Sequence, residues 1–402
     1  MRREVSRRRL SDDAKQIRPM SDSRTLFPAS VESRRRVYAF SGGGTGGHLM
    51  PGLALAAALR DEDPHAEIQF VGSGKSLEKD LVTRQGYAHL ALPVEPLPTL
   101  KQTPWRFLWR NWQAYRLAAD WLTDHQPQCV IGLGGYASAP LVLAAARRSI
   151  PAILIEQNVI PGRATRWLAP RTQGVVVSFA ETGRTLQGTI YDFGTPVRTE
   201  IARLAAEERY DPPEGEASQL LILGGSQGAA TLNEAVLQAT AGLRDELRGW
   251  RILHQTGTEQ ADAVRDRYAG LGLAAEVSPF IADMGECYRR TTLVISRAGA
   301  TTLAELACAG LPALLVPFPF AADDHQSRNA ELFVRAGAAR MVVQEHSAEE
   351  TATRLKGELL PLLQEARHRQ AVREQMRRLA RPDATSRVVG LIRELCGRGQ
   401  TP

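Results

Sequence analysis

Two glycine-rich phrases in the sequence could bind anions. The first reads Ser41-Gly-Gly-Gly-Thr-Gly-Gly-His48 and the second reads Leu223-Gly-Gly-Ser-Gln-Gly228. Each follows a short apolar run typical of a strand and precedes an Ala- and Leu-rich run typical of a helix. Because the first N–H groups of a helix lack intrahelical partners and lie at the positive end of its dipole, each unit can hold a phosphate. Two such units predict two similar domains, which would suit an enzyme that joins two phosphorylated substrates.

His48, at the end of the first phrase, could act as a base. The phrase matches GxGxxG at Gly42, Gly44 and Gly47, but no convincing acidic ribose ligand stands about 20 residues further on. A Walker-type loop is excluded because no Lys-Ser/Thr pair follows the glycines. Histidine titrates near neutral pH, so His48 at the carboxyl edge of a sheet could remove a proton from a sugar hydroxyl. The alternative is a polar residue that only opens a helix.

Glu305 belongs to a third strand–turn–helix pattern, Ser296-Arg-Ala-Gly-Ala-Thr-Thr-Leu-Ala-Glu-Leu306. Thr301 or Thr302 can cap this helix, which places Glu305 about one turn inside it. A carboxylate has two acceptor oxygens and can therefore accept both hydroxyls of a ribose. The alternative is an acid that only stabilises the positive end of the helix. On the first interpretation, the helix starts at 225–228 and 299–302 converge on one nucleotide.

Neither the acidic residues nor the cysteines predict a metal site. Asp61-Glu62-Asp63 matches the DxD pattern of metal-dependent sugar-nucleotide enzymes. It falls after a helix and before a strand, at the wrong edge of the sheet for a ligand, so we expect a solvated loop. The four cysteines contain no CxxC pair, and Cys129 and Cys308 lie in apolar stretches, which fits a reducing compartment.

The segment from Leu97 to Trp121 reads LPTLKQTPWRFLWRNWQAYRLAADW and interleaves aromatic with basic side chains. Because Trp prefers the membrane interface and Arg attracts anionic headgroups, this segment could rest on a membrane. The alternative is the ordinary core packing of a helix. The residues that would contact the membrane are Trp105, Arg106, Phe107, Trp109 and Arg110.

The positive charge of the chain is concentrated at its N-terminus. Residues 1–36 carry 11 basic and 5 acidic side chains, an excess that accounts for the net charge of +6 over all 402 residues. This Arg-rich stretch lacks hydrophobic periodicity, so we expect a disordered tail. It could be a solvated extension, a contact to anionic lipid or nucleic acid, or residues ahead of a true start at Met20. No apolar run predicts a membrane span or a signal peptide.

Strand and helix patterns alternate along the rest of the chain. Strand-type apolar runs of the first half stand at 37–40, 68–71, 129–133, 152–155 and 174–178. The pattern restarts after a polar link, with runs at 220–223, 251–254, 276–277, 293–296 and 313–316. This alternation predicts α/β domains with parallel sheets covered by helices on both faces. We expect a tail over 1–36, a first domain over 37–195 and a second domain over 196–402 that ends in charged helices.

Taken together, in order and spacing, these phrases resemble the MurG family of glycosyltransferases, which convert lipid I to lipid II in peptidoglycan synthesis. The similar blocks extend from about Val37 to Val343. They read GGTGGHLMPGLALA, GLGGYASAP, EQNVIPGRATRWLA, GTPVR, GGSQGAATLN, PFIADM, SRAGATTLAELACAGLPALLVPFPFAADDHQSRNA and RAGAA. The resemblance implies a GT-B fold, in which two Rossmann-like, doubly wound parallel-sheet domains face each other across a cleft.

The resemblance also implies a reaction. The donor would be UDP-GlcNAc, held mainly by the second domain. The acceptor would be undecaprenyl-diphosphate-MurNAc-pentapeptide, held by the first domain at the cytoplasmic face of the bacterial inner membrane. GlcNAc would move to the C4 hydroxyl of MurNAc with inversion at its anomeric carbon. No metal is required by this reaction, although Mg²⁺ could assist it, and cell-wall or division proteins would be partners while nucleic acid would not.

Site residues follow from the resemblance, position by position. The substrate-binding residues would be Thr45, Gly46, Gly47, Asn158, Arg198, Ser226, Ile281, Ala300, Thr301, Thr302, Leu303, Ala304, Glu305 and Gln326. Ser226 and Arg198 would bind the diphosphate, and the Ile281 backbone would read the uracil edge. Glu305 would hold the ribose, while amides would meet the sugar hydroxyls. The catalytic base stays open among His48, Glu156 and Tyr136.

Other functions fit parts of the same pattern. A different GT-B enzyme, such as a glycolipid glycosyltransferase or a UDP-GlcNAc epimerase, would share the donor site, but an epimerase would need no lipid acceptor. A non-catalytic nucleotide-sugar-binding protein would not need His48, Asn158 and Glu305 together. An NAD-dependent oxidoreductase is disfavoured because the acidic ribose ligand is missing after the first phrase.

Overall fold

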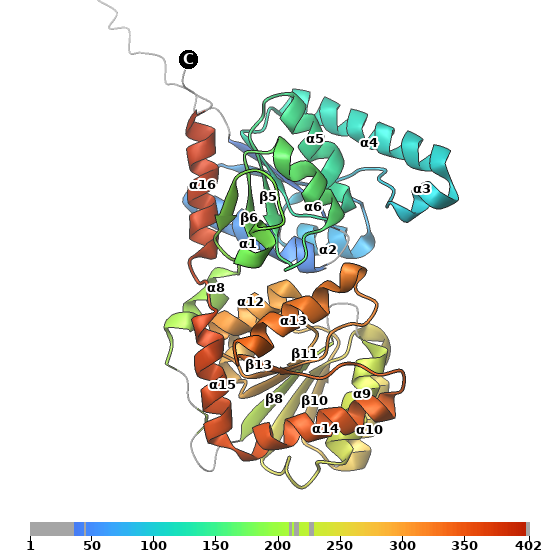
Figure 1. The fold of residues 1–402 in the computed structure, drawn as a ribbon, viewed down its shortest axis with the longest axis vertical. Coiled ribbons are helices and arrows are strands. Elements are labelled where there is room, and N and C mark those ends of the chain that lie inside the picture. Colours follow the sequence, from blue (N-terminus) through green and yellow to red (C-terminus); the bar gives the residue numbers. More distant parts are fainter. Residues whose placement is uncertain (1–35, 44–45, 209–210, 213–216, 225–228, 399–402) are drawn as a thin grey trace, which may run out of the picture. The chain divides into compact units, whose positions relative to one another are not determined.

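The computed structural model describes residues 36–43, 46–208, 211–212, 217–224 and 229–398. Within this part of the chain, two parallel sheets follow one another in sequence (Figure 1). The first has seven strands in the order β3-β2-β1-β4-β5-β6-β7, and the second has six in the order β10-β9-β8-β11-β12-β13. In both sheets the first strand of the domain lies inside and the order reverses beside it. The predicted fold class, two doubly wound Rossmann-like domains of the GT-B type, is therefore confirmed.

The first sheet carries its helices between successive strands. Its strands are β1 (Val37–Ser41), β2 (Glu67–Gly72), β3 (Ala88–Ala91), β4 (Cys129–Gly132), β5 (Ala152–Glu156), β6 (Gly174–Val177) and β7 (Ile190–Asp192). Its helices are α1 (Gly46–Glu62), α2 (Ser76–Arg84), α3 (Pro98–Gln102), α4 (Pro104–His125), η1 (Tyr136–Ser138), α5 (Ala139–Arg147), α6 (Arg163–Leu168), η2 (Ala169–Arg171) and α7 (Ala180–Gly183).

The second domain follows a linker formed by α8 (Thr199–Ala202) and η3 (Arg203–Ala206). Its strands are β8 (Ser218–Leu223), β9 (Trp250–Gln255), β10 (Ala275–Ser278), β11 (Leu293–Ser296), β12 (Ala313–Leu315) and β13 (Ala339–Met341). Its helices are α9 (Ala230–Ala241), η4 (Thr258–Gln260), α10 (Ala261–Leu271), α11 (Met284–Arg290), α12 (Ala300–Ala309), η5 (Ala322–Asp324), α13 (His325–Arg335), α14 (Ala348–Gln364), α15 (Ala366–Arg378) and α16 (Ala384–Arg398).

Side-chain alternation along the strands builds a separate core on each face of each sheet. In β1, Val37 and Ala39 join one buried cluster with α4 and α5, while Tyr38 and Phe40 join the opposite one with α1. Successive residues of a strand point to opposite faces, so a strand buried on both faces is apolar throughout. The predicted short apolar runs are therefore strands of parallel sheets, interior in every case except β10, which lies at an edge.

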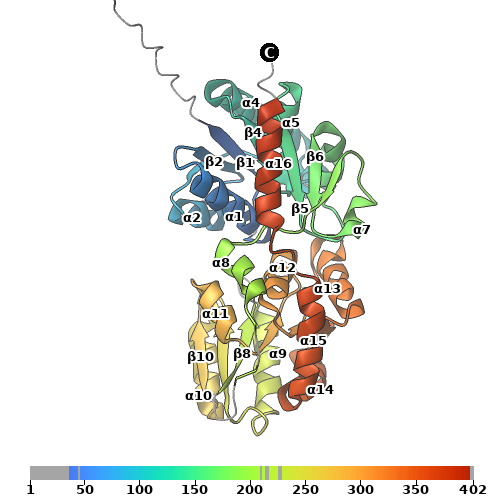
Figure 2. The same ribbon diagram turned by 90° about the vertical axis from the view of Figure 1, so that its left-hand side faces the viewer.

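Helix α16 packs against the first domain, although it follows the second in sequence (Figures 1 and 2). Its apolar face enters the cluster under β1 and α1 with Val388, Val389, Leu391, Ile392 and Leu395. At its start, Thr385 accepts from the Val197 N–H (3.1 Å) and donates to the Val197 carbonyl (2.7 Å). The predicted bounds of the second domain, 196–402, therefore do not match the packing at their end. The last helix of that range, α16, belongs to the core of the first domain.

Candidate active site

The first glycine phrase brings backbone to the carboxyl edge of the first sheet. Gly42 has φ +135°, and a Cβ there would lie 2.7 Å from the Gly134 carbonyl oxygen. Gly43 has φ +146°, and its Cβ would lie 2.5 Å from the carboxyl group of Glu78. The positive φ strains any side chain at both positions, and at Gly42 the Gly134 backbone also leaves no space for a Cβ. Gly44 and the predicted ligand Thr45 lie outside the described residues, and α1 begins at Gly46, beside the predicted Gly47.

His48 lies in the first turn of α1 with its ring against the Gly134 backbone, where a Cβ would meet Nδ1 at 3.1 Å. Its Nδ1 is 3.3 Å from Gln157 Oε1, and Gln157 Nε2 donates to the Leu133 carbonyl at 3.3 Å. A carbonyl only accepts, so the amide nitrogen must face Leu133 and the amide oxygen must face His48. Nδ1 then carries the hydrogen in the neutral ring, which leaves the lone pair of Nε2 to act as a base.

Glu156, a second candidate base, is almost fully buried at the end of β5. Its Oε1 accepts from the backbone N–H of Asn158 (3.1 Å) and from Asn158 Nδ2 (3.3 Å), and its Oε2 accepts from the Gly162 N–H (3.0 Å). The carboxylate therefore organises the loop after β5. The third candidate, Tyr136, is partly buried and follows two glycines of positive φ at the same edge of the sheet.

Asn329 of α13 connects two loops that are far apart in sequence. Its Nδ2 donates to Asn158 Oδ1 (3.1 Å) and to the Ala298 carbonyl (3.2 Å), and its Oδ1 accepts from the Val159 N–H (2.9 Å). The loop after β5 is thereby held to the loop before α12. Sequence reasoning did not single out Asn329, although it lies in the phrase DDHQSRNA that carried the resemblance.

The start of α12 contacts the start of α1. Thr301 Oγ1 donates to the Gly47 carbonyl at 2.8 Å, so this hydroxyl is used between the two helices. Of the predicted segment 300–305, Thr302 and Ala304 are partly exposed. Leu303 is a packing residue, because its side chain lies in the core and its N–H donates to the Gly299 carbonyl within the helix.

Glu305 is buried between two partners at this edge. Tyr288 donates to its Oε2 at 2.9 Å, and the Arg198 guanidinium donates to its Oε1 at 3.4 Å. Burial raises the pKa of Glu305 above its ordinary value, while Arg198 and Tyr288 act in the opposite direction. Among the described residues, the buried Nε of Arg198 has no hydrogen-bond acceptor within reach, and Glu200 lies 3.7 Å away as an ion-pair partner.

The remaining donor positions follow strands of the second sheet. Gly224 follows β8, where its N–H donates to the Gln255 carbonyl (3.3 Å), but the predicted Ser226 lies outside the described residues. Ile281 is partly buried after β10, and Gln326 in the first turn of α13 accepts from the Phe318 N–H at 2.9 Å. Because parallel strands end at one edge, these positions lie on the side of the sheet where such folds bind ligands.

The predicted membrane segment is exposed over the first half of α4, which Figure 1 shows extending beyond the first sheet. Trp105 is 83% exposed, Trp109 57% and Trp112 49%, whereas the buried residues of the helix begin at Ala114. Core packing is therefore excluded for these tryptophans, and Phe107 is partly buried. Arg106 and Arg110 both pair with Glu95, at 2.8 and 3.7 Å, which offsets part of their charge.

The predicted acidic loop is mostly helical, because Asp61 and Glu62 are the last two residues of α1 and only Asp63 lies beyond it. Asp63 accepts from the His65 N–H at 3.1 Å and lies 3.6 Å from Arg36, and Glu62 pairs with Arg393 at 2.9 Å. Among the described residues, no three His, Cys, Asp or Glu side chains are grouped as metal ligands. In the same part of the chain, every helix is too short or too polar to cross a bilayer.

Two family descriptions match the chain in sequence order. Residues 38–177 match the glycosyltransferase family 28 N-terminal domain, and residues 219–388 match the glycosyltransferase family 28 C-terminal domain. The chain belongs to glycosyltransferase family 28. The first match covers the first sheet up to β6, and the second match covers the second sheet.

Members of this family with high similarity share one name. A protein of Desulfotalea psychrophila is 37% identical over 375 residues, covering 92% of this chain and 99% of that protein. One of Acidithiobacillus ferrooxidans is 40% identical over 357 residues, covering 88% and 96%. Both are named UDP-N-acetylglucosamine–N-acetylmuramyl-(pentapeptide) pyrophosphoryl-undecaprenol N-acetylglucosamine transferase.

Solved structures of this family and of the wider fold superpose on the chain. Acinetobacter baumannii MurG has a TM-score of 0.69 at 28% identity, covering 89% of this chain and 99% of that chain. UDP-GlcNAc 2-epimerase from Neisseria meningitidis, bound to UDP-GlcNAc, has a TM-score of 0.61 at 13% identity, covering 89% and 100%. At that identity the epimerase supports the shared fold alone.

Proposed function

We propose that this glycosyltransferase moves GlcNAc from UDP-GlcNAc to the C4 hydroxyl of MurNAc in undecaprenyl-diphosphate-MurNAc-pentapeptide, converting lipid I to lipid II. The contact between α1 and α12 carries the proposal. The hydrogen bond from Thr301 to Gly47 holds the start of α12, the helix of Glu305, against the start of α1, the helix of His48. This contact supports a proposed base on one domain, His48, acting on a donor held by the other. The shared name of relatives that align over most of the chain supports the same reaction.

The proposed chemistry is one in-line displacement. His48 Nε2 takes the proton of the MurNAc C4 hydroxyl. The hydroxyl oxygen attacks the anomeric carbon of GlcNAc as the bond from that carbon to the UDP oxygen breaks. Attack opposite the leaving group turns the α-linked donor into a β-linked product. Gln157 keeps the proton on Nδ1 of His48, which maintains Nε2 as the acceptor.

The leaving diphosphate gains negative charge in this step. Backbone N–H groups at the helix starts and the guanidinium of Arg198 are the groups proposed to stabilise it. The buried Nε of Arg198, which lacks an acceptor among the described residues, supports this role. These positive groups make a bound metal unnecessary for the proposed step, and retention of transfer in excess EDTA is the corresponding test.

Donor contacts can form with hydrogen-bonding groups that the protein leaves available. Asn158 Nδ2 donates one of its two hydrogens to Glu156 Oε1, and Gln326 Oε1 accepts from the Phe318 N–H. Each side chain therefore keeps at least one amide hydrogen for a sugar hydroxyl. Glu305 is proposed to take the ribose and the Ile281 backbone the uracil edge, with Gly46 and Gly47 beside the reacting sugar.

The exposed stripe of α4 is proposed to place the first domain on the cytoplasmic face of the inner membrane. Trp105, Leu108, Trp109 and Trp112 follow the three- and four-residue spacing of one helix face, and all are exposed. Such a face can enter the headgroup region while neighbouring cations meet anionic lipid. The enzyme would then meet its lipid-linked acceptor at the surface where that acceptor lies.

The deciding experiment is transfer of labelled GlcNAc from UDP-GlcNAc to a short-chain lipid I analogue. The proposal expects a disaccharide-linked lipid and free UDP in equal amounts. Incubation with UDP-GlcNAc alone tests the epimerase alternative, which would yield UDP-ManNAc without an acceptor. Donor binding without either product would instead support a non-catalytic nucleotide-sugar-binding protein.

A further inference from the structure

Tyr288 is a fully buried tyrosine whose hydroxyl contacts Glu305, the carboxylate predicted to bind the ribose. It lies in α11, and its hydroxyl donates to Glu305 Oε2 at 2.9 Å. Arg198, from the segment before α8, reaches the other oxygen of the same carboxylate. Three separate elements therefore meet at Glu305, and only Glu305 and Arg198 belong to the positions that the sequence resemblance identified.

The number of acceptor sites on the carboxylate limits what Glu305 can still bind. A carboxylate offers about four lone-pair sites, two on each oxygen. Tyr288 occupies one on Oε2 and Arg198 one on Oε1, so one site on each oxygen stays available. Two adjacent acceptor sites match the two adjacent hydroxyls of a ribose. We propose that Tyr288 is a positioning residue that orients Glu305 for the 2′,3′-diol of the donor nucleotide. This inference rests on the proposed function, which assigns the ribose to Glu305.

The electrostatic environment supports the same role. Burial raises the pKa of Glu305, and a protonated carboxyl group would lose acceptor capacity. The hydrogen bond from Tyr288 lowers that pKa and so favours the carboxylate form. Burial also raises the pKa of Tyr288 well above its ordinary value, which keeps its hydroxyl protonated and able to donate.

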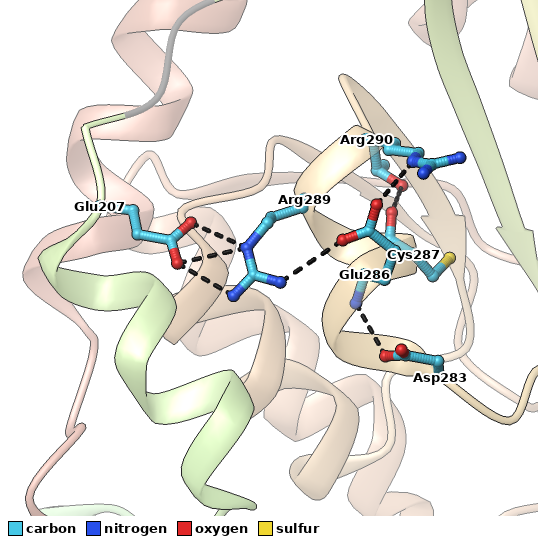
Figure 3. A network of polar contacts seen from close by, with 7 residues as sticks. Glu207, Asp283, Glu286, Cys287, Arg289 and Arg290 are labelled. Atoms are coloured by element: carbon cyan, nitrogen blue, oxygen red, sulfur yellow. Dashed lines mark hydrogen bonds and ion pairs between the residues drawn. The ribbon is translucent and has the colours of Figure 1, made fainter.

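Helix α11 is attached through Arg289 to Glu207, the residue that follows η3 (Figure 3). Arg198 precedes α8 at the other end of the same linker. Asp283 caps the helix by accepting from the Glu286 N–H at 2.9 Å. Arg289, the residue after Tyr288, donates to both oxygens of Glu207 at 3.0–3.3 Å and also contacts Glu286. A two-pronged guanidinium–carboxylate contact fixes orientation as well as distance. The two donors to Glu305 are therefore held on connected elements.

The test compares binding of UDP and of 2′-deoxy-UDP, by calorimetry, to the full-length wild type and to Tyr288→Phe. Wild type should prefer UDP, because the deoxy ligand leaves one acceptor site of Glu305 unfilled. In Tyr288→Phe, UDP affinity should fall about three- to tenfold while 2′-deoxy-UDP affinity falls less, so the preference shrinks. The matched control is Tyr268→Phe, which removes another fully buried hydroxyl of the same domain, hydrogen-bonded to His254. It should leave the preference unchanged.

Several outcomes would overturn the inference. If Tyr288→Phe loses affinity equally for UDP and 2′-deoxy-UDP, or loses none, its preference for UDP is unchanged. Tyr288 would then have a structural role only. If Tyr288→Phe does not fold, Tyr288→Met replaces the ring by an apolar chain without a hydroxyl, and the same reduced preference is required of it. Absence of UDP binding to folded wild type would reject the donor site itself, so a failure of the proposed function is distinguished from a failure at Tyr288.

Discussion

Asn329 Nδ2 donates to Asn158 Oδ1 at 3.1 Å, although the two residues stand 171 positions apart in the chain. Asn329 is completely buried and also binds the backbone on both sides of this contact, at Val159 and Ala298. One side chain of the second domain thus holds the predicted sugar-binding loop of the first. The candidate site depends on this connection as well as on the residues that would touch substrate.

Asn329→Ala should lower the free energy of unfolding by about 1–3 kcal/mol, because it leaves buried backbone groups without partners. It should also raise the KM for UDP-GlcNAc, since Asn158 loses its support. Denaturant unfolding and initial rates measure the two effects. Arg328→Ala, at an exposed neighbouring position whose guanidinium pairs with Glu331, is the control and should stay close to wild type. The prediction is contradicted if Asn329→Ala has the same free energy of unfolding and the same KM as Arg328→Ala.

His48→Ala should lower kcat by about 10²- to 10⁴-fold, the usual contribution of a general base, with little change in donor affinity. The measurement combines steady-state transfer rates with calorimetric binding of UDP-GlcNAc. His65→Ala removes an exposed histidine from the loop beyond α1 and should leave both quantities unaltered. Turnover of His48→Ala near the wild-type rate would reassign the base.

Glu305→Ala should weaken UDP binding by about 10- to 100-fold, because hydrogen bonds to a charged group contribute more than neutral ones. Calorimetry with UDP measures this directly. Glu358→Ala, which removes a surface carboxylate paired with Arg340 in the same domain, serves as the control. Equal UDP affinity in wild type and Glu305→Ala would refute the ribose assignment.

His254 should make the protein less stable in acid. Burial lowers its pKa from 6.5 to about 3, and its ring is bonded to Tyr268 and Asn233. As pH falls below 6.5 the unfolded chain takes up a proton that the folded protein does not, so stability present above that pH is lost progressively toward pH 3. The loss should be about 2 kcal/mol between pH 7 and pH 5.

Comparison of urea unfolding curves for wild type and His254→Gln at pH 7 and pH 5 isolates this contribution. The variant is expected to be less stable at pH 7, because it disturbs a buried network, but the difference should shrink at pH 5. A constant difference between the two proteins at both pH values would show that His254 does not govern acid stability.

Replacing Trp105, Arg106 and Trp109 together by serine should reduce binding to anionic liposomes by about tenfold or more, since apolar area and a cation are both removed. The fold should be spared because the two tryptophans are exposed. Liposome sedimentation measures binding, and circular dichroism measures the fold. Trp167→Ser, which removes an exposed tryptophan of α6, is the control. Undiminished sedimentation of the triple variant would leave α4 without a membrane role.

Of the strands that the sequence predicted, all but one are interior; the exception is β10, an edge strand marked only by the short run at 276–277. β1, β4, β5, β8 and β11 are buried on both faces, and their apolar runs were readable without a structure. The strands that it missed, β3, β7 and β13, all lie at sheet edges. An edge strand is partly exposed, so its residues carry no continuous apolar run to mark it.

The strand–glycine–helix units and the fold class could be predicted from the sequence, because they depend on local pattern and residue type, and the site residues stay a prediction. The folded structure was needed to show that α16 returns to the first domain, that tryptophans of α4 are exposed, and that Gln157 contacts Nδ1 of His48. It alone joined Tyr288 to Glu305 and Asn329 to Asn158. The residue type of a helix face or polar side chain shows which chemistry its contact must have. Which residue makes that contact depends on how segments far apart in the sequence pack together.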